Sequence, residues 1–210
     1  MCIRDRYYDR GVRVINPVWS RQNAFGHGVP FRFPHSPDTG PGLTAAGKDL
    51  VAACNEMKIV VDLAHLNEKG FWDVAAISPA PLVNSHTAVH NICAMTRNIT
   101  DRQIEAIGQS GGLIGIYYMP MGLRSDGKND RDMPLAAIVK HIDYIVDLIG
   151  IDHVGLGSDF DGAGMPYGLA DCAHLPNLLQ VLEKAGYAEE DLAKIAYKNW
   201  LRVLKETWQS

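Results

Sequence analysis

The chain has 210 residues, of which 47% are hydrophobic and 21% are charged, and this is the composition of one soluble globular domain spanning residues 1–210. The formal net charge of −4 excludes the basic surface that nucleic acid binding requires, and the chain has neither the roughly 20-residue apolar run of a membrane-spanning helix nor the apolar centre of a secretory signal. We therefore expect a cytoplasmic protein with no nucleic acid or membrane partner and with free thiols at Cys2, Cys54, Cys93 and Cys172.

The first predicted element is a strand over residues 11–19, and an irregular segment follows it. From Pro17 to Pro41 the chain contains five prolines and several glycines. Such a segment is too long and irregular for an ordinary connection. It is a functional loop over a site, a mobile lid, or a solvated surface insertion, and the sequence leaves these alternatives open.

A helix is predicted over residues 43–58, because apolar side chains recur there at helical spacing. The apolar run at residues 59–65 (IVVDLAH) then predicts a buried strand that ends at His65. The next strand is predicted over residues 81–86 (PLVNSH) and ends at His86. Because neighbouring strand residues point to opposite faces, we expect Ser85 and His86 not to form a nucleophile–base pair.

The second half of the chain continues this alternation. A helix over residues 100–112 is predicted to open with Thr100 and Gln103 as a capping box and to close on Gly111. The remaining predicted elements are a strand over 112–118, a helix over 134–150 ending at Gly150, a strand over 153–162, and helices over 175–185 and 189–205. His141, inside one of these helices, is expected to be structural or solvated.

Near-continuous apolar strands that alternate with helices predict parallel βαβ units and an α/β fold. The units can form an open doubly wound sheet or a (β/α) barrel. The segment GLGSDFDGAG is not a dinucleotide-binding turn, because Phe160 stands where the third glycine belongs. It is not a calcium loop either, because Ala163 stands where an oxygen ligand is needed.

Three polar side chains lie at the carboxyl ends of predicted strands: His65, His86 and Asp159. In a parallel barrel these ends open onto one face, and catalytic residues gather there. Imidazole and carboxylate groups are ligands that zinc accepts. The pattern favours a metal site, and the alternative is that polar strand ends cap neighbouring helices.

These segments resemble the membrane (renal-type) dipeptidase family of zinc metallopeptidases. The resembling pieces run in order from about residue 11 to residue 204 and include NEMKIVVDLAH, APLVNSH, CAMTRN, GGLIGI, HVGLGSDFDG and the C-terminal LPNLLQVLEKAGYAEEDLAKIAYKNWLRVL. The resemblance implies a TIM-type (β/α)₈ barrel, of which this chain supplies about the last five βα units. It also implies two zinc ions, a dipeptide substrate, and a homodimer as one alternative for the assembly.

The resemblance assigns roles to four residues of this chain. His65 and His86 match histidines that bind zinc, and Arg97 matches the arginine that binds the substrate carboxylate. Asp159 matches the aspartate that contacts the substrate and handles the proton at the scissile bond.

The chain also departs from the family pattern. The HxD pair of the family's first strand and the glutamate of its third strand, which complete the two-zinc site, have no counterpart in this chain, and Trp19 stands where the family has a histidine near the substrate. An indole N–H donates a hydrogen bond but cannot accept one or carry a proton. We therefore expect a C-terminal fragment that binds zinc weakly and hydrolyses little when alone. Five strands cannot close an eight-stranded barrel, so we also expect self-association.

Two alternative functions fit the same residues. One is a metal-free barrel remnant that acts as a binding or scaffold protein. The other is a related zinc hydrolase that acts on cyclic amides or lactones.

Overall fold

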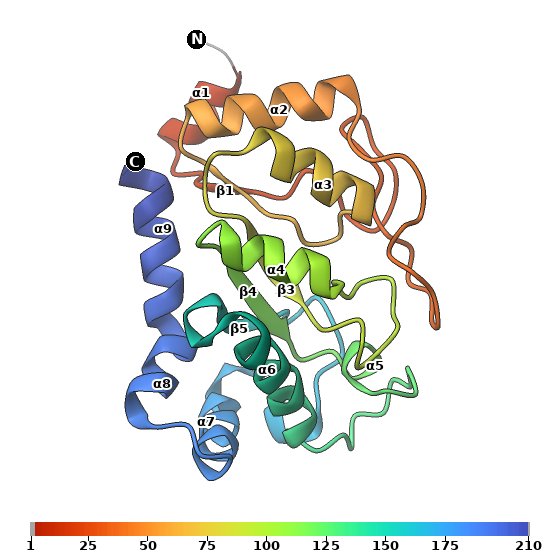
Figure 1. Cartoon of the computed structure of the whole chain (residues 1–210), viewed down its shortest axis with the longest axis vertical. Helices are drawn as coiled ribbons and strands as arrows, with labels where there is room; N and C mark the ends of the chain where they lie inside the picture. The colour runs from red at the N-terminus through yellow and green to blue at the C-terminus, as the bar shows by residue number, and fades with distance from the viewer. Residues whose placement is uncertain (1–2, 210) are drawn as a thin grey trace.

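A computed structural model of the chain describes residues 3–209 (Figure 1). It contains five parallel strands: β1 (Val14–Ile15), β2 (Val60–Val61), β3 (Val83–Thr87), β4 (Leu113–Tyr117) and β5 (Val154–Ser158). β1 pairs with β2, and β3, β4 and β5 form a second sheet in that order. A parallel bridge between Asp62 and Val83 connects the two sheets, so the strands follow one another in chain order. The α/β prediction is confirmed, and the sheet is open among the described residues.

β1 and β2 are shorter than the predicted strands over residues 11–19 and 59–65. Pro17 follows shortly after β1, and proline has no N–H to donate to a ladder. After β2, the Asp62 carboxylate accepts hydrogen bonds from the backbone N–H groups of Ala64 (3.1 Å) and Ser85 (2.9 Å). A side chain therefore takes up donors that a longer strand would have paired with backbone carbonyls.

The helices are α1 (Ile3–Asp9), α2 (Ala45–Glu56), α3 (Glu68–Ile77), α4 (Asp101–Gln109), α5 (Pro120–Leu123), α6 (Ala136–Ile149), α7 (Leu175–Lys184), α8 (Glu189–Ala193) and α9 (Asn199–Gln209). The predicted helices over 43–58, 100–112, 134–150 and 175–185 are confirmed. Gly111 (φ 73°) and Gly150 (φ 91°) follow the ends of two of them at positive φ, which glycine adopts without a steric cost.

Two helical segments differ from the predictions. α3 was not predicted, and it begins where the Asn67 side chain accepts a hydrogen bond from Gly70 N at 2.8 Å. The predicted helix over 189–205 divides into α8, a π-helical turn (Lys194–Lys198) and α9. Side-chain periodicity does not reveal a short π-helical segment, because one extra residue rotates the direction of the apolar face by only part of a turn.

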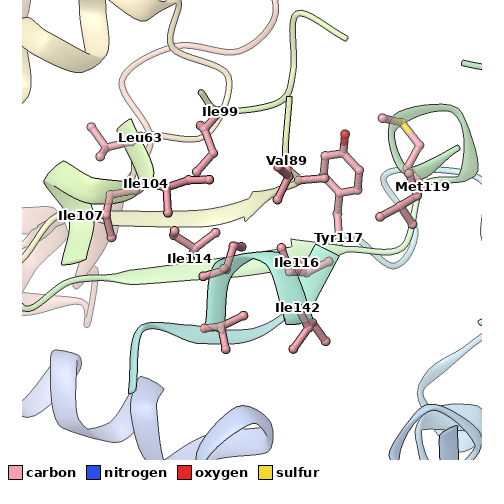
Figure 2. Packing of buried hydrophobic residues seen from close by; sticks show 14 of the residues in the cluster. Leu63, Val89, Ile99, Ile104, Ile107, Ile114, Ile116, Tyr117, Met119 and Ile142 are labelled. Carbon is pink, nitrogen blue, oxygen red and sulfur yellow. The ribbon is translucent and has the colours of Figure 1, made fainter. Parts of the chain in front are cut away.

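The main core lies between the strands and the helices that cover them. Figure 2 shows Ile104 and Ile107 of α4 beside Ile114 of β4, and all three side chains are fully buried. A smaller cluster joins Val60, Val83 and Leu113 to Val203 of α9.

Helix α9 lies at the amino-terminal ends of β4 and β5, beside β4 in Figure 1. Its Arg202 guanidinium donates hydrogen bonds to the carbonyls of Gly111 (2.6 Å) and Asp152 (2.8 Å), which lie shortly before β4 (Leu113–Tyr117) and β5 (Val154–Ser158). The carboxyl ends of the strands are therefore the ends where a site can open.

The structure also bears on the membrane and thiol predictions. Within residues 3–209, no helix has both the length and the apolar character needed to span a membrane. Cys93 and Cys172 are free cysteines, as predicted, and Cys54 is buried. Cys2 lies outside the described residues.

Candidate functional site

The proline-rich segment from Pro17 to Pro41 lies across the ends of β2 and β3. Ser20 Oγ is 2.7 Å from His65 Nδ1, and Val29 N donates a hydrogen bond to the His65 carbonyl at 2.9 Å. Further along, Thr96 N donates to the Arg32 carbonyl at 3.1 Å. Of the three alternatives for this segment, the contacts favour a functional loop over a site.

His65 and His86 meet at the centre of this site. Their Nε2 atoms are 2.9 Å apart, and their ring centroids are 4.9 Å apart. His65 has φ 66°, a left-handed conformation that a non-glycine residue rarely adopts, and this turns the chain just after β2. Burial and the nearby Arg97 guanidinium lower the pKa of both histidines, and the pKa of His65 falls to about 2. Both rings are therefore neutral, which is the form that binds metals.

The other ring nitrogens have hydroxyl partners. Ser85 Oγ is 2.7 Å from His86 Nδ1 and donates its own proton to Asp62 Oδ2 at 2.5 Å. Because that hydroxyl proton is used, His86 Nδ1 must be the donor to Ser85, and the lone pair of His86 lies on Nε2. Asp62 and Ser85 thus orient His86 as outer-shell carboxylates orient metal-binding histidines.

The contact between Ser85 and His86 corrects the expectation that these neighbours point to opposite faces. The register between β3 and β4 shifts between Asn84 and Thr87, so β3 is irregular where the two side chains leave it. A bulge of this kind re-aims side chains at the end of a strand. Ser85 is nevertheless placed as an orienting partner, since its hydroxyl proton is directed to Asp62.

Asp159 lines the same cavity as His65 and His86, which has a volume of ≈ 470 Å³. Its backbone is left-handed, with φ 68°, and it lies between Ser158 at 33° and Asp161 at 64°. The carboxylate is packed closely against the next turn, because a Cβ on Gly162 would lie 2.3 Å from Asp159 Oδ1. Local backbone strain therefore fixes the direction of this side chain.

Arg97 lies deeper, at 4% exposure, and one of its terminal nitrogens donates to the His86 carbonyl at 3.1 Å. Its Nε has no hydrogen-bond partner among the described residues. Burial lowers the pKa of Arg97, while Tyr117, Asp159 and Asp62 oppose that shift. Arg97 lines a second cavity of ≈ 280 Å³ together with His65 and Asp159. A buried guanidinium with an unused donor fits a carboxylate or another anion.

The structure brings all four predicted site residues together. His65, His86 and Asp159 surround one cavity and Arg97 reaches the adjoining one, so the predicted common rim is confirmed, while their chemical roles stay predictions. The sequence interpretation missed the orienting residues, which are Ser20, Asp62 and Ser85. Asp62 carried a usable signal, since an acidic residue inside the buried run IVVDLAH requires a buried partner.

The two imidazoles fit a partial zinc site. Two nitrogen ligands of one tetrahedral zinc ion lie about 3.3 Å apart, as zinc–nitrogen bonds of about 2.0–2.1 Å require, so the rings would separate by only about half an ångström. Within residues 3–209, no group of three or more His, Cys, Asp or Glu side chains is arranged to hold a metal ion. The metal site that the sequence favoured from His65, His86 and Asp159 together is therefore not formed among the described residues, in which the two imidazoles contact each other as a pair.

Comparison with known proteins identifies relatives of this chain. The family model described as "Membrane dipeptidase (Peptidase family M19)" matches residues 3–210. A Klebsiella pneumoniae protein, "Uncharacterized protein in pqqA 5'region", is 50% identical over 203 residues, which are 97% of this chain and 75% of that protein.

Two crystal structures are also similar. The dipeptidase AC, a metallopeptidase of family M19, matches with a TM-score of 0.96 and 48% identity over 98% of this chain. A metallopeptidase from Rhodobacter sphaeroides, liganded with a phosphinate mimic of the dipeptide L-Ala-D-Ala, matches with a TM-score of 0.95 and 49% identity over 97% of this chain. This chain spans 59% and 58% of those two chains.

Proposed function

We propose, because this chain belongs to the membrane dipeptidase family (peptidase family M19), that it carries part of the active site of a zinc-dependent dipeptidase. The observation that carries the proposal is the pair of neutral imidazoles, His65 and His86, beside Arg97 and Asp159. On the same premise, the five strands form part of a TIM-type (β/α)₈ barrel whose carboxyl ends hold the site.

In this proposal each residue has a defined task, and Asp159 contacts the substrate as well as transferring a proton. His65 and His86 would hold zinc through Nε2, with Nδ1 of each ring bonded to a serine hydroxyl. Zinc in such a site polarises a carbonyl and lowers the pKa of bound water. Arg97 binds the carboxylate of the substrate through its planar guanidinium, and this selects short peptides with a free C-terminus. The Asp159 carboxylate accepts the proton of the attacking water and returns it to the leaving amine.

The dipeptide as substrate class is supported by the Rhodobacter sphaeroides metallopeptidase, which binds a dipeptide mimic. The cavity that contains Arg97 has a volume of ≈ 280 Å³, which is near the lower end of small-molecule sites and suits a compact ligand. A cytoplasmic location is part of the same proposal.

A zinc titration by calorimetry tests the metal assignment. The 210-residue chain is expected to bind zinc weakly, because His65 and His86 supply two ligands of the usual four. His65→Ala and His86→Ala should each abolish the binding. His174→Ala should leave it unchanged, since His174 is an exposed histidine bonded to Asp171. Tight binding of two ions, or binding that survives both site substitutions, would contradict the assignment.

Trp19 supports a second candidate function. It lines both cavities in place of the family's histidine, and its indole cannot accept a proton. A chain that keeps Arg97 but not catalysis would bind peptides without hydrolysing them. Dipeptide binding without any turnover, measured with zinc in excess, would favour this binding function over the dipeptidase.

A further inference from the structure

Two exposed aromatic side chains of the proline-rich loop stand beside the site. Trp19 is 51% exposed and Phe31 is 43% exposed, and their ring centroids are 6.0 Å apart. Both rings also lie against His65, at centroid distances of 5.8 and 6.4 Å. Large aromatic rings left open on a cavity wall are typical of a surface that contacts an apolar group of a ligand.

The ≈ 280 Å³ cavity has both apolar and polar lining. Trp19, Phe31, Met119 and Met121 supply its apolar residues. His65, Arg97 and Asp159 supply polar groups to the same space. A ligand that fills this cavity therefore carries an anionic group and, close to it, an apolar side chain whose burial is favourable.

The aromatic pair is held in place before any ligand arrives. Ser20, next to Trp19, is bonded to His65, and the Arg21 guanidinium lies over the indole at 5.1 Å from its centroid. Residues on both sides of Phe31 are tied to Thr96, which bonds to the Pro30 carbonyl and accepts from Arg32 N at 3.1 Å. A preorganised surface loses little conformational entropy on binding, so its contacts contribute directly to affinity.

We propose that Trp19 and Phe31 form an apolar wall that makes this chain prefer dipeptides with a large apolar or aromatic side chain. This inference rests on the proposed function, since it takes the carboxylate of the dipeptide to bind Arg97. Trp19, which stands where the family has a histidine, then contributes a surface that determines substrate specificity at that position. The expected preference for Ala-Phe over Ala-Ala is about tenfold in Kd, the scale at which apolar pockets discriminate side chains.

The test is a calorimetric titration of the 210-residue chain, in excess zinc chloride, with Ala-Ala, Ala-Leu and Ala-Phe. Trp19→Ala and Phe31→Ala should each reduce the preference for Ala-Phe over Ala-Ala severalfold. Trp19→Phe should retain most of the preference. Phe25→Ala is the matched control, because Phe25 is an aromatic residue of the same loop that lines a different cavity. Thermal melting verifies that each variant folds. If Trp19→Ala does not fold, the dipeptide preferences of Phe31→Ala and Trp19→Phe test the apolar wall.

The outcomes separate the two proposals. Equal Kd values for the three dipeptides in the unchanged chain would overturn the apolar wall and leave the dipeptide site standing. A loss of affinity for all three dipeptides alike in Trp19→Ala would show a structural role for Trp19 and would also overturn the inference. Failure of every dipeptide to bind the unchanged chain would contradict the proposed function together with the wall.

Discussion

At the scale of single residues, the position of the Asp159 carboxylate depends on the absence of a side chain at Gly162. Gly162 and Ala163 donate backbone hydrogen bonds to the Asp159 carbonyl, which folds the turn back over the carboxylate. The close approach of Gly162 to Asp159 Oδ1 leaves no room for a methyl group. The position of the carboxylate thus depends on a residue with no chemistry of its own.

Gly162→Ala is therefore expected to displace Asp159 and to weaken dipeptide binding about three- to tenfold, the loss of one hydrogen bond. Calorimetric titration with Ala-Phe in excess zinc measures the change. Gly168→Ala is the matched control, because Gly168 lines neither cavity and a Cβ there would make only an ordinary contact with the Leu135 side chain at 3.6 Å. If the two alanine variants bound alike, Asp159 would have no part in holding the ligand.

At the same scale, the sequence predicted that His65, His86 and Asp159 lie together, but it did not predict how these side chains are oriented. Position at strand ends indicated His65, His86 and Asp159, and the family resemblance added Arg97. The hydroxyl partners depend on a register shift in β3 and on a loop that reaches back to His65. Neither feature leaves a periodic trace in the sequence, which is why the relation between Ser85 and His86 was predicted wrongly.

At the scale of elements, His141 connects helix α6 to the segments around it. The side chain is fully buried, accepts a hydrogen bond from Val89 N at 3.0 Å, and lies 3.0 Å from the Leu123 carbonyl. Burial lowers its pKa to about 4, and Lys140 adds to that shift while the bond to the Leu123 carbonyl opposes it. Of the two predicted alternatives for His141, structural or solvated, the structure shows the structural one.

Acidification is therefore expected to destabilise the packing of α6 against the segments that contain Val89 and Leu123. Because the pKa of His141 is lower in the folded chain than its ordinary value of 6.5, its stabilisation is complete above about pH 6.5 and declines as the pH falls toward 4. The loss between pH 8 and pH 5 is about 2 kcal/mol. Urea unfolding across this range should show a smaller pH dependence in His141→Gln, which keeps a donor and an acceptor but does not titrate. An unchanged dependence would show that other groups cause the acid sensitivity.

Elements were predicted well where local chemistry defines them. α4 and α6 end at glycines that the sequence marks, and Thr100 N donates to Gln103 Oε1 at 2.9 Å as a capping box requires. α3 was missed because its cap is an asparagine directly after the His65 turn. The lengths of β1 and β2 were overestimated because the Asp62 side chain competes for the backbone donors of the ladder.

At the scale of the whole molecule, the open sheet leaves an apolar border beside β1. Val14 is 46% exposed, and an adjacent cavity of ≈ 390 Å³ is lined by Ile15, Phe25, Leu50 and other apolar residues. Unpaired strand edges with apolar neighbours invite pairing with another chain. The predicted self-association thus has a definite surface.

Val14→Lys is expected to reduce this association, because a charged side chain on an edge strand opposes pairing with a second edge. Sedimentation velocity over a range of concentrations measures it. Leu148→Lys, on α6 and away from β1, is the control for a simple gain of charge at an exposed leucine. A sharp monomer boundary for the unchanged chain, with cooperative melting, would contradict the expectation.

The left-handed backbone at His65, Ser158, Asp159 and Asp161 sets a limit on how this chain can be improved. Each such residue costs of order 1 kcal/mol that glycine, and in part asparagine, would avoid. A laboratory selection for heat tolerance alone should therefore drift toward glycine and asparagine at these four positions. The more heat-tolerant variants would have a less strained backbone but would lack the imidazole and carboxylate groups of the site. Thermal stability and site chemistry therefore make opposite demands on these backbone positions.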